Sequence, residues 1–100
     1  MDAEFERAVR TLLAQVPKGC VTTYGELARL AGFPGYARHV GKLLSDMPED
    51  SKLPWHRVVT ASREVSRRGT SAAALQKQLL RAEGVRLKGD RVERSHLWLL

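Results

Sequence analysis

Residues 23–44 read TYGELARLAGFPGYARHVGKLL, and this stretch decides the fold. Thr23 followed three residues later by Glu26 is typical of a capping box, which marks the start of a helix. A glycine ends that helix, and Phe-Pro-Gly at 33–35 forms a turn before another helix at about 36–44. Two short helices across a tight turn, placed after a longer helix, predict a helix-turn-helix.

The longer helix is predicted upstream of this stretch. Apolar residues from Phe5 to Val16 keep the i, i+3, i+4, i+7 spacing of one helical face, and Asp2 is a candidate cap. Pro17 and Gly19 end this helix. In the helix at 36–44, four apolar residues share the face predicted to be buried: Ala37, Val40, Leu43 and Leu44.

Downstream of residue 44 the sequence predicts a small β wing. Residues 45–54 are polar and broken by prolines, as in a surface loop. The β-prone run 56–60 is predicted to pair with 64–66 through a turn at 61–63.

A fourth helix is predicted over 72–83, after a cap at Ser71 and before Gly84. Its expected core face consists of Leu75, Leu79, Leu80 and Ala82. Residues 85–92 predict a short hairpin or an extended strand, and we expect 97–100 to pack back onto the domain. The predicted fold class is therefore mainly α with a small β wing, a winged helix-turn-helix.

Length and composition fit this fold. One hundred residues, 43% of them hydrophobic and 28% charged, suit a single globular domain over 1–100 and exclude a multi-domain enzyme. The net charge of +6 favours a polyanionic partner such as nucleic acid. Most of it lies in residues 61–100, where nine Lys and Arg face four Asp and Glu.

Cysteine content and hydropathy indicate where the chain works. The single Cys20 excludes an internal disulfide and any multi-cysteine metal site, so we expect no metal and no cofactor. The acidic start and the lack of a long apolar run predict neither a signal peptide nor a membrane helix. We expect a cytoplasmic protein, associated with the nucleoid when bound to DNA, or a nuclear one in a eukaryote.

The segment 53–59, Leu-Pro-Trp-His-Arg-Val-Val, carries the sharpest functional signal. Here the chain resembles the O6-alkylguanine-DNA alkyltransferase family, whose active site reads Pro-Cys-His-Arg-Val. Other motifs agree in order, from about Phe5 to Gly84: Val16-Pro17, Thr23 to Ala28, Ala37 to Gly41, and Glu83-Gly84. In this alignment of motifs Trp55 occupies the position of the cysteine.

That replacement determines the chemistry that the resemblance implies. Alkyl transfer needs a thiolate, and an indole has no ionisable sulfur, so Trp55 cannot accept an alkyl group. The Pro-Trp-His-Arg form is typical of alkyltransferase-like proteins, which bind alkylated DNA without repairing it. The resemblance therefore implies a monomeric sensor that binds double-stranded DNA, flips an O6-alkylguanine into a pocket lined by Trp55, and directs the site to nucleotide excision repair.

The resemblance also assigns roles to individual residues. Arg38 matches the arginine that enters the duplex through the minor groove, and Tyr24 matches the tyrosine that helps to rotate the nucleotide out. Arg68 is expected to face the pocket, although Arg67 could hold that role and both could contact phosphate. The pocket is completed by His56, Val58 and Glu83, with His56 and Glu83 as hydrogen-bonded structural partners.

Other interpretations compete with this one. Trp55 and Tyr24 could be ordinary core aromatics, Arg38 a solvated helix residue, and Glu83 an exposed carboxylate. A plain helix-turn-helix would place the helix at 36–44 in the major groove, as in a winged-helix transcription regulator or an architectural DNA-binding protein. A third hypothesis is an active alkyltransferase that uses Cys20.

Overall fold

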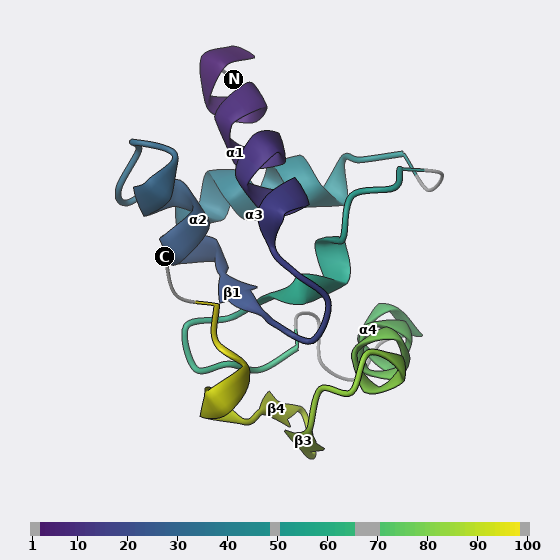
Figure 1. The fold of residues 1–100 in the computed structure, drawn as a ribbon. Coiled ribbons are helices and arrows are strands. Elements are labelled where there is room, and N and C mark those ends of the chain that lie inside the picture. The colour runs from purple at the N-terminus through teal and green to yellow at the C-terminus, as the bar shows by residue number, and fades with distance from the viewer. Residues whose placement is uncertain (1–2, 49–50, 66–70, 99–100) are drawn as a thin grey trace.

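The computed structural model describes residues 3–48, 51–65 and 71–98 (Figure 1). In these residues the chain forms four α-helices: α1 (Ala3–Gln15), α2 (Tyr24–Leu30), α3 (Ala37–Ser45) and α4 (Ser71–Ala82). Four two-residue strands accompany them: β1 (Thr22–Thr23), β2 (Val58–Val59), β3 (Leu87–Lys88) and β4 (Arg91–Val92). Two short 3-10 helices complete the fold: η1 (Trp55–Arg57) and η2 (Arg94–His96). No helix of the described residues is long and apolar enough to cross a membrane.

The predicted helix-turn-helix is confirmed. The Thr23 side chain caps α2 by accepting a hydrogen bond from the Glu26 backbone N–H at 3.1 Å. The Glu26 carboxylate does not turn back to complete the capping box; it binds the Arg29 guanidinium at 2.9 and 2.7 Å instead. In the turn before α3, Gly35 has a φ of +88°, a backbone conformation that favours glycine.

Aromatic rings hold this turn against α1. The Phe5 ring meets the Phe33 ring edge to face at 5.1 Å, and the Tyr36 ring lies 5.7 Å from Phe5. On α3, Val40 and Leu43 are buried as predicted, whereas Ala37 and Leu44 are only half-buried. One face of α3 therefore closes the core and the opposite face is open to solvent.

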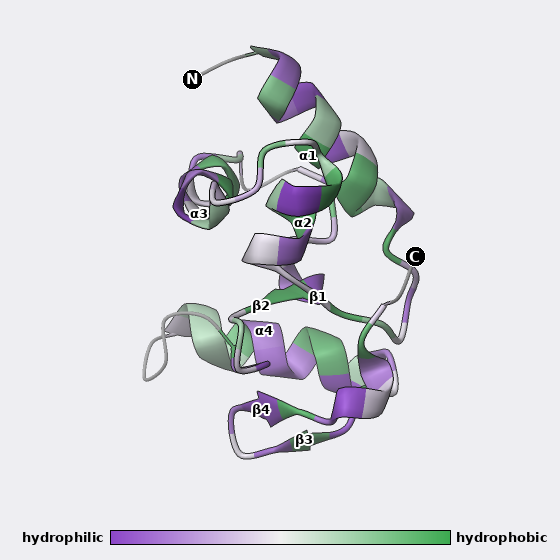
Figure 2. Cartoon of the chain, turned by 90° about the vertical axis from the view of Figure 1, so that its left-hand side faces the viewer, coloured by the Kyte–Doolittle hydropathy of each residue, from purple (hydrophilic) through white to green (hydrophobic). Residues whose placement is uncertain are grey.

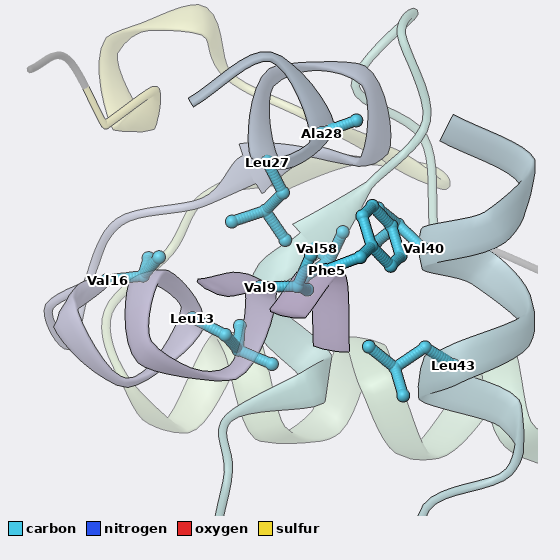
Figure 3. Packing of buried hydrophobic residues seen from close by; sticks show 9 residues of the cluster. All are labelled: Phe5, Val9, Leu13, Val16, Leu27, Ala28, Val40, Leu43 and Val58. Atoms are coloured by element: carbon cyan, nitrogen blue, oxygen red, sulfur yellow. The ribbon is translucent and has the colours of Figure 1, made fainter. Parts of the chain in front are cut away.

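The strands β1 and β2 separate two hydrophobic cores. Figure 2 shows α1, α2 and α3 on one side of this parallel pair, and α4 with the β3–β4 hairpin on the other. Val58 packs into the first core and Val59 into the second, because successive side chains of a strand point to opposite faces. Figure 3 shows the first core, built by Phe5, Val9, Leu13, Val16, Leu27, Ala28, Val40, Leu43 and Val58.

The turn predicted at 61–63 forms, with the Thr60 N–H donating to the Glu64 carbonyl at 2.9 Å, but the predicted strand partner of the run 56–60 is wrong. β2 pairs in parallel with β1, with Thr22 opposite Val58 and Thr23 opposite Val59. The segment expected to pair with it turns toward the C-terminal hairpin instead: Glu64 bridges Arg91, and Ser66 lies outside the described residues. Because both valines of β2 are fully buried, this strand needs a partner inside the domain rather than in a surface wing.

The predicted core face of α4 is also wrong in part. The helix buries Ala73, Gln76 and Leu80, whereas Leu75 is 46% exposed. Leu79 is half-buried and Ala82 is exposed. The Gln76 amide explains the rotation, because it donates hydrogen bonds to the backbone carbonyls of His56 at 3.1 Å and Val58 at 2.8 Å.

The predicted C-terminal hairpin is confirmed, and of the segment 97–100, predicted to pack back, Leu97 and Trp98 contact the cores while residues 99–100 lie outside the described residues. Leu87–Lys88 and Arg91–Val92 form an antiparallel hairpin, and the chain then returns to β1, where the Val21 N–H donates to the His96 carbonyl at 2.9 Å. The His96 ring also accepts from the Arg86 N–H through Nε2 at 3.0 Å. Its Nδ1 lies 2.9 Å from the Gly19 carbonyl, an acceptor, so Nδ1 carries the proton.

The two threonines of β1 provide a stability prediction. The Thr22 hydroxyl is buried and has no hydrogen-bond partner within the described part of the chain, whereas the Thr23 hydroxyl caps α2. We expect Thr22→Val to raise the free energy of unfolding by about 1 kcal/mol, since it removes an unsatisfied polar group at nearly constant volume. Thr23→Val should lower it by about 1 kcal/mol. Urea denaturation of both variants checks this; destabilisation by Thr22→Val would contradict it.

Candidate nucleic-acid interface

A cavity of about 590 Å³ opens between α2, α3, η1 and α4. Its volume lies within the range of small-molecule sites. The apolar part of its wall consists of Gly41, Leu44, Met47, Pro48, Trp55, Ala72 and Leu75, and the polar part of Tyr24, Ser45, Ser51 and Gln76. None of these side chains carries a charge, so the cavity suits a flat, largely apolar group.

Trp55 stands at the edge of this cavity. It is the first residue of η1, directly after Pro54, and it is half-buried. Its ring meets the His56 ring nearly perpendicularly, with the centroids 6.1 Å apart. The 3-10 turn thus sends the two side chains of this motif in different directions, and of the two only Trp55 lines the cavity.

Tyr24 forms another part of the wall. As the first residue of α2 it packs against the first core, and its ring lies over Gly41 of α3. A Cβ atom at Gly41 would lie 3.9 Å from Tyr24 Cε1, an ordinary van der Waals distance, so this position of α3 faces the ring. The structure therefore gives Tyr24 both positions that the sequence left open, against the core and at the cavity.

Behind Trp55, three side chains form a compact charge network. Glu83, just after α4, accepts hydrogen bonds from Arg57 at 3.0 and 2.6 Å and lies 2.8 Å from His56 Nε2. A third bond joins Arg57 Nη1 to the carbonyl of Val16 at 2.8 Å. The network links the end of α1, η1 and the end of α4, and it fixes the turn that presents Trp55.

The electrostatics of Glu83 follow from this network. Burial by itself raises the pKa of the Glu83 carboxyl, but hydrogen bonds from Arg57 and His56, together with their charges, outweigh it and lower the pKa to about 2. Glu83 is therefore an anion at neutral pH and balances the positive charge of Arg57. Glu83 is not the exposed carboxylate that the sequence left open, because only 13% of its side chain is accessible to solvent.

Val58 does not lie where the sequence placed it. It was predicted as a pocket residue, but it is fully buried in the first core and does not line the cavity. The reason is the alternation along β2, which turns Val58 toward α1 and α2. Of the predicted site residues, the cavity brings together Tyr24 and Trp55, while His56 and Glu83 meet behind it.

Arg38 lies on the open face of α3. It is exposed, one residue after the helix begins, and it forms no ion pair with any described residue. His39 and Lys42 are exposed on the same helix, so this face is basic. Arg67 and Arg68 lie outside the described residues.

Some residues of the site were missed in the sequence. Leu44 and Leu75, predicted only as core residues, form part of the apolar wall, and their place depends on folding rather than on any local pattern. Gln76 shares the stripe of Ala73 and Leu80 at spacings of three and four, a signal that would have placed it on the buried face. No group of three or more His, Cys, Asp or Glu residues in the described segments is arranged to hold a metal ion.

Comparison with known proteins gives concordant results. Residues 4–85 match the family model described as the DNA binding domain of 6-O-methylguanine DNA methyltransferase. A protein of Vibrio parahaemolyticus named DNA base-flipping protein is 45% identical over 97 residues, which cover 95% of this chain and 96% of that protein. Alkyltransferase-like protein 1 of Schizosaccharomyces pombe is 40% identical over 85 residues, 84% of this chain and 79% of that protein.

A solved structure extends this similarity to three dimensions. The crystal structure of S. pombe Atl1 in complex with damaged DNA containing O6-carboxymethylguanine superposes with a TM-score of 0.91. The two chains are 33% identical, and the match covers 100% of this chain and 99% of that one.

Proposed function

Because the chain belongs to the family of 6-O-methylguanine DNA methyltransferase DNA-binding domains, as an alkyltransferase-like member, we propose that it is a non-enzymatic sensor of O6-alkylguanine in double-stranded DNA. In this function the damaged nucleotide rotates out of the duplex into the cavity between Tyr24 and Trp55. Relatives named for base flipping, and one solved with damaged DNA, support the proposal.

The observation that carries the proposal is the place of Trp55 on the cavity wall. The site has the volume and apolar surface to hold a flipped base. The resemblance of the motif at 53–59 implies that Trp55 takes the position of the alkyltransferase nucleophile. Stacking of a base on an aromatic ring contributes about 1–3 kcal/mol. Extrusion of a base costs a few kcal/mol and is cheapest at a weakened pair. The balance therefore favours a damaged guanine over a normal one.

The remaining steps fall to residues outside the cavity. Arg38 on the open face of α3 would enter the minor groove and occupy the gap left by the extruded nucleotide, where its planar guanidinium can stack and hydrogen-bond. The nearby basic surface would hold the phosphates, which sets affinity for any duplex. Affinity and damage preference thus depend on different residues.

The decisive experiment compares two duplexes of one sequence, one with a single O6-methylguanine and one with guanine. We expect the damaged duplex to bind about tenfold more tightly or better, because opening the weakened pair costs less and the cavity gains stacking. Fluorescence anisotropy at fixed ionic strength measures this. Equal affinity would contradict the proposal, and a consensus recovered from random undamaged duplexes would favour a transcription regulator.

We also propose that the chain transfers no alkyl group. The cavity wall contains no thiol, and Cys20 is half-buried against the first core. After incubation with methylated DNA, we expect the intact mass of the protein to be unchanged. A gain of about 14 mass units on Cys20, one methylene, would establish transfer and overturn this part of the proposal.

Finally, we propose that the bound complex marks the site for nucleotide excision repair. In a cell-free excision assay, the protein should raise the rate of incision at an O6-alkylguanine. Trp55→Ala should lose this effect because it removes the indole ring from the cavity wall. An incision rate independent of the protein would contradict this link to excision repair, but it would not contradict the proposed binding of the lesion.

A further inference from the structure

A second cavity, of about 430 Å³, borders the three residues of η1 and shares part of its wall with the first. It runs along residues 51–57 and reaches Ala14 of α1. Its wall differs in chemistry from that of the first cavity: Lys52, His56 and Arg57 border it, and no acidic side chain among the described residues does. Ser51 and Trp55 line both cavities, so the two spaces share a boundary.

The charge of the second cavity comes from Lys52. The hydrogen bonds of Arg57 go to Glu83 and to the Val16 carbonyl, and the Glu83 carboxylate offsets its charge. Lys52, by contrast, is exposed and forms no ion pair with the residues that the structure describes. It lies in sequence between Ser51 and Trp55, the two residues of the shared boundary. Within the described residues, an unpaired cation therefore lines the second cavity, whose wall shares Ser51 and Trp55 with the first.

The described wall of the first cavity offers an anion no counter-charge. None of the residues that line it in the described segments is charged, and burying a carboxylate without a partner is costly. A substituent that passes Trp55 would enter the second cavity, whose wall includes Lys52, a cation on a flexible stem. A neutral first cavity followed by a cation in the second would therefore distinguish O6 substituents by the charge at their far end.

We propose that the second cavity is an anion subsite, which gives the protein a preference for O6 substituents that end in a carboxylate over neutral substituents of the same shape. This inference rests on the proposed function, since it requires the damaged base to occupy the first cavity. Lys52 is the specificity-determining residue. Its ammonium would donate to the carboxylate of the ligand.

The test uses the full chain and four duplexes of one sequence: guanine, O6-methylguanine, O6-carboxymethylguanine and O6-carbamoylmethylguanine. The last two differ only by a carboxylate against its neutral amide. We expect the carboxymethyl duplex to bind about fivefold more tightly than the carbamoylmethyl duplex, the size of a solvent-accessible ion pair. The preference should shrink as salt is raised.

Two matched variants assign the effect. Lys52→Met removes the charge but keeps an unbranched apolar stem, and it should abolish the carboxylate preference while leaving affinity for O6-methylguanine unchanged. Lys88→Met, at the exposed position of β3 in the C-terminal hairpin, should keep the preference. Both variants alter exposed side chains, so neither is expected to impair folding.

The outcomes distinguish failure of the anion subsite from failure of the proposed lesion sensor. Equal affinity for the carboxymethyl and carbamoylmethyl duplexes overturns the anion subsite, and so does a Lys52→Met variant that weakens all four duplexes alike, as a plain phosphate contact would. In either case, preference for O6-methylguanine over guanine would still support the proposed sensor. If that preference is also absent, the proposed function itself fails.

Discussion

Replacing Arg38 by alanine is expected to weaken binding to a duplex with O6-methylguanine by about 30- to 100-fold, equivalent to about 2–3 kcal/mol. The side chain is exposed and has no ion-pair partner in the described residues, so its loss should leave folding unchanged. In the proposed complex it fills the gap left by the flipped nucleotide, and without it the opened duplex collapses. Anisotropy titration with damaged and undamaged duplexes measures both effects.

Two further substitutions make this prediction specific. Arg38→Lys keeps the charge but not the planar guanidinium, so it should bind undamaged DNA nearly as well as the original chain and damaged DNA almost as poorly as Arg38→Ala. Lys42→Ala, on the same helix and paired with Asp46 at 3.2 Å, should weaken both duplexes slightly and equally. If Arg38→Lys restored damage preference, Arg38 would be only a phosphate contact.

The helices were predictable because their signals are local. Thr23 and Glu26 mark the start of α2, and the apolar spacing from Phe5 to Val16 follows the buried face of α1. These patterns act over one or two turns of the chain. The helix-turn-helix therefore follows from the sequence without knowledge of its tertiary contacts.

The strand pairing and the face of α4 depend on contacts between distant residues. Val58 and Val59 fit a surface wing as well as a central strand by composition, and only the presence of a core on each side decides between them. Gln76 is polar, so a prediction of the core from the spacing of apolar residues leaves it out. In the fold it is buried because the carbonyls of His56 and Val58 accept its protons.

The site was predictable to the extent that motifs carry it. Tyr24 and Trp55 came from motifs and do line one cavity, whereas Val58 belongs to the same motif and lies in the core. The walls from Met47 and Leu75 depend on how α3, η1 and α4 pack, which no motif encodes. A motif thus indicates which residues lie near a site but not which of them face it.

The second large effect concerns stability and centres on Glu83. We expect Glu83→Gln to lower the free energy of unfolding at neutral pH by about 3 kcal/mol, because it leaves the mostly buried Arg57 guanidinium without its counter-charge. Glu93→Gln is the matched control: this carboxylate pairs with Arg86 on the surface, and its loss should cost less than about 1 kcal/mol. Urea denaturation of both variants at neutral pH measures the difference.

The pH dependence of this effect follows from the sign of the pKa change. The pKa of Glu83 falls from 4.5 to about 2 in the folded chain, so the unfolded state binds a proton more readily as the solution becomes acidic. The contribution of Glu83 is therefore complete above about pH 4.5 and is lost as the pH falls toward 2. The stability gap between the original chain and Glu83→Gln should narrow over that interval. A gap that stays constant from neutral pH to pH 2 would show that Glu83 acts through packing and not through its charge, and the network behind Trp55 would then not be electrostatic.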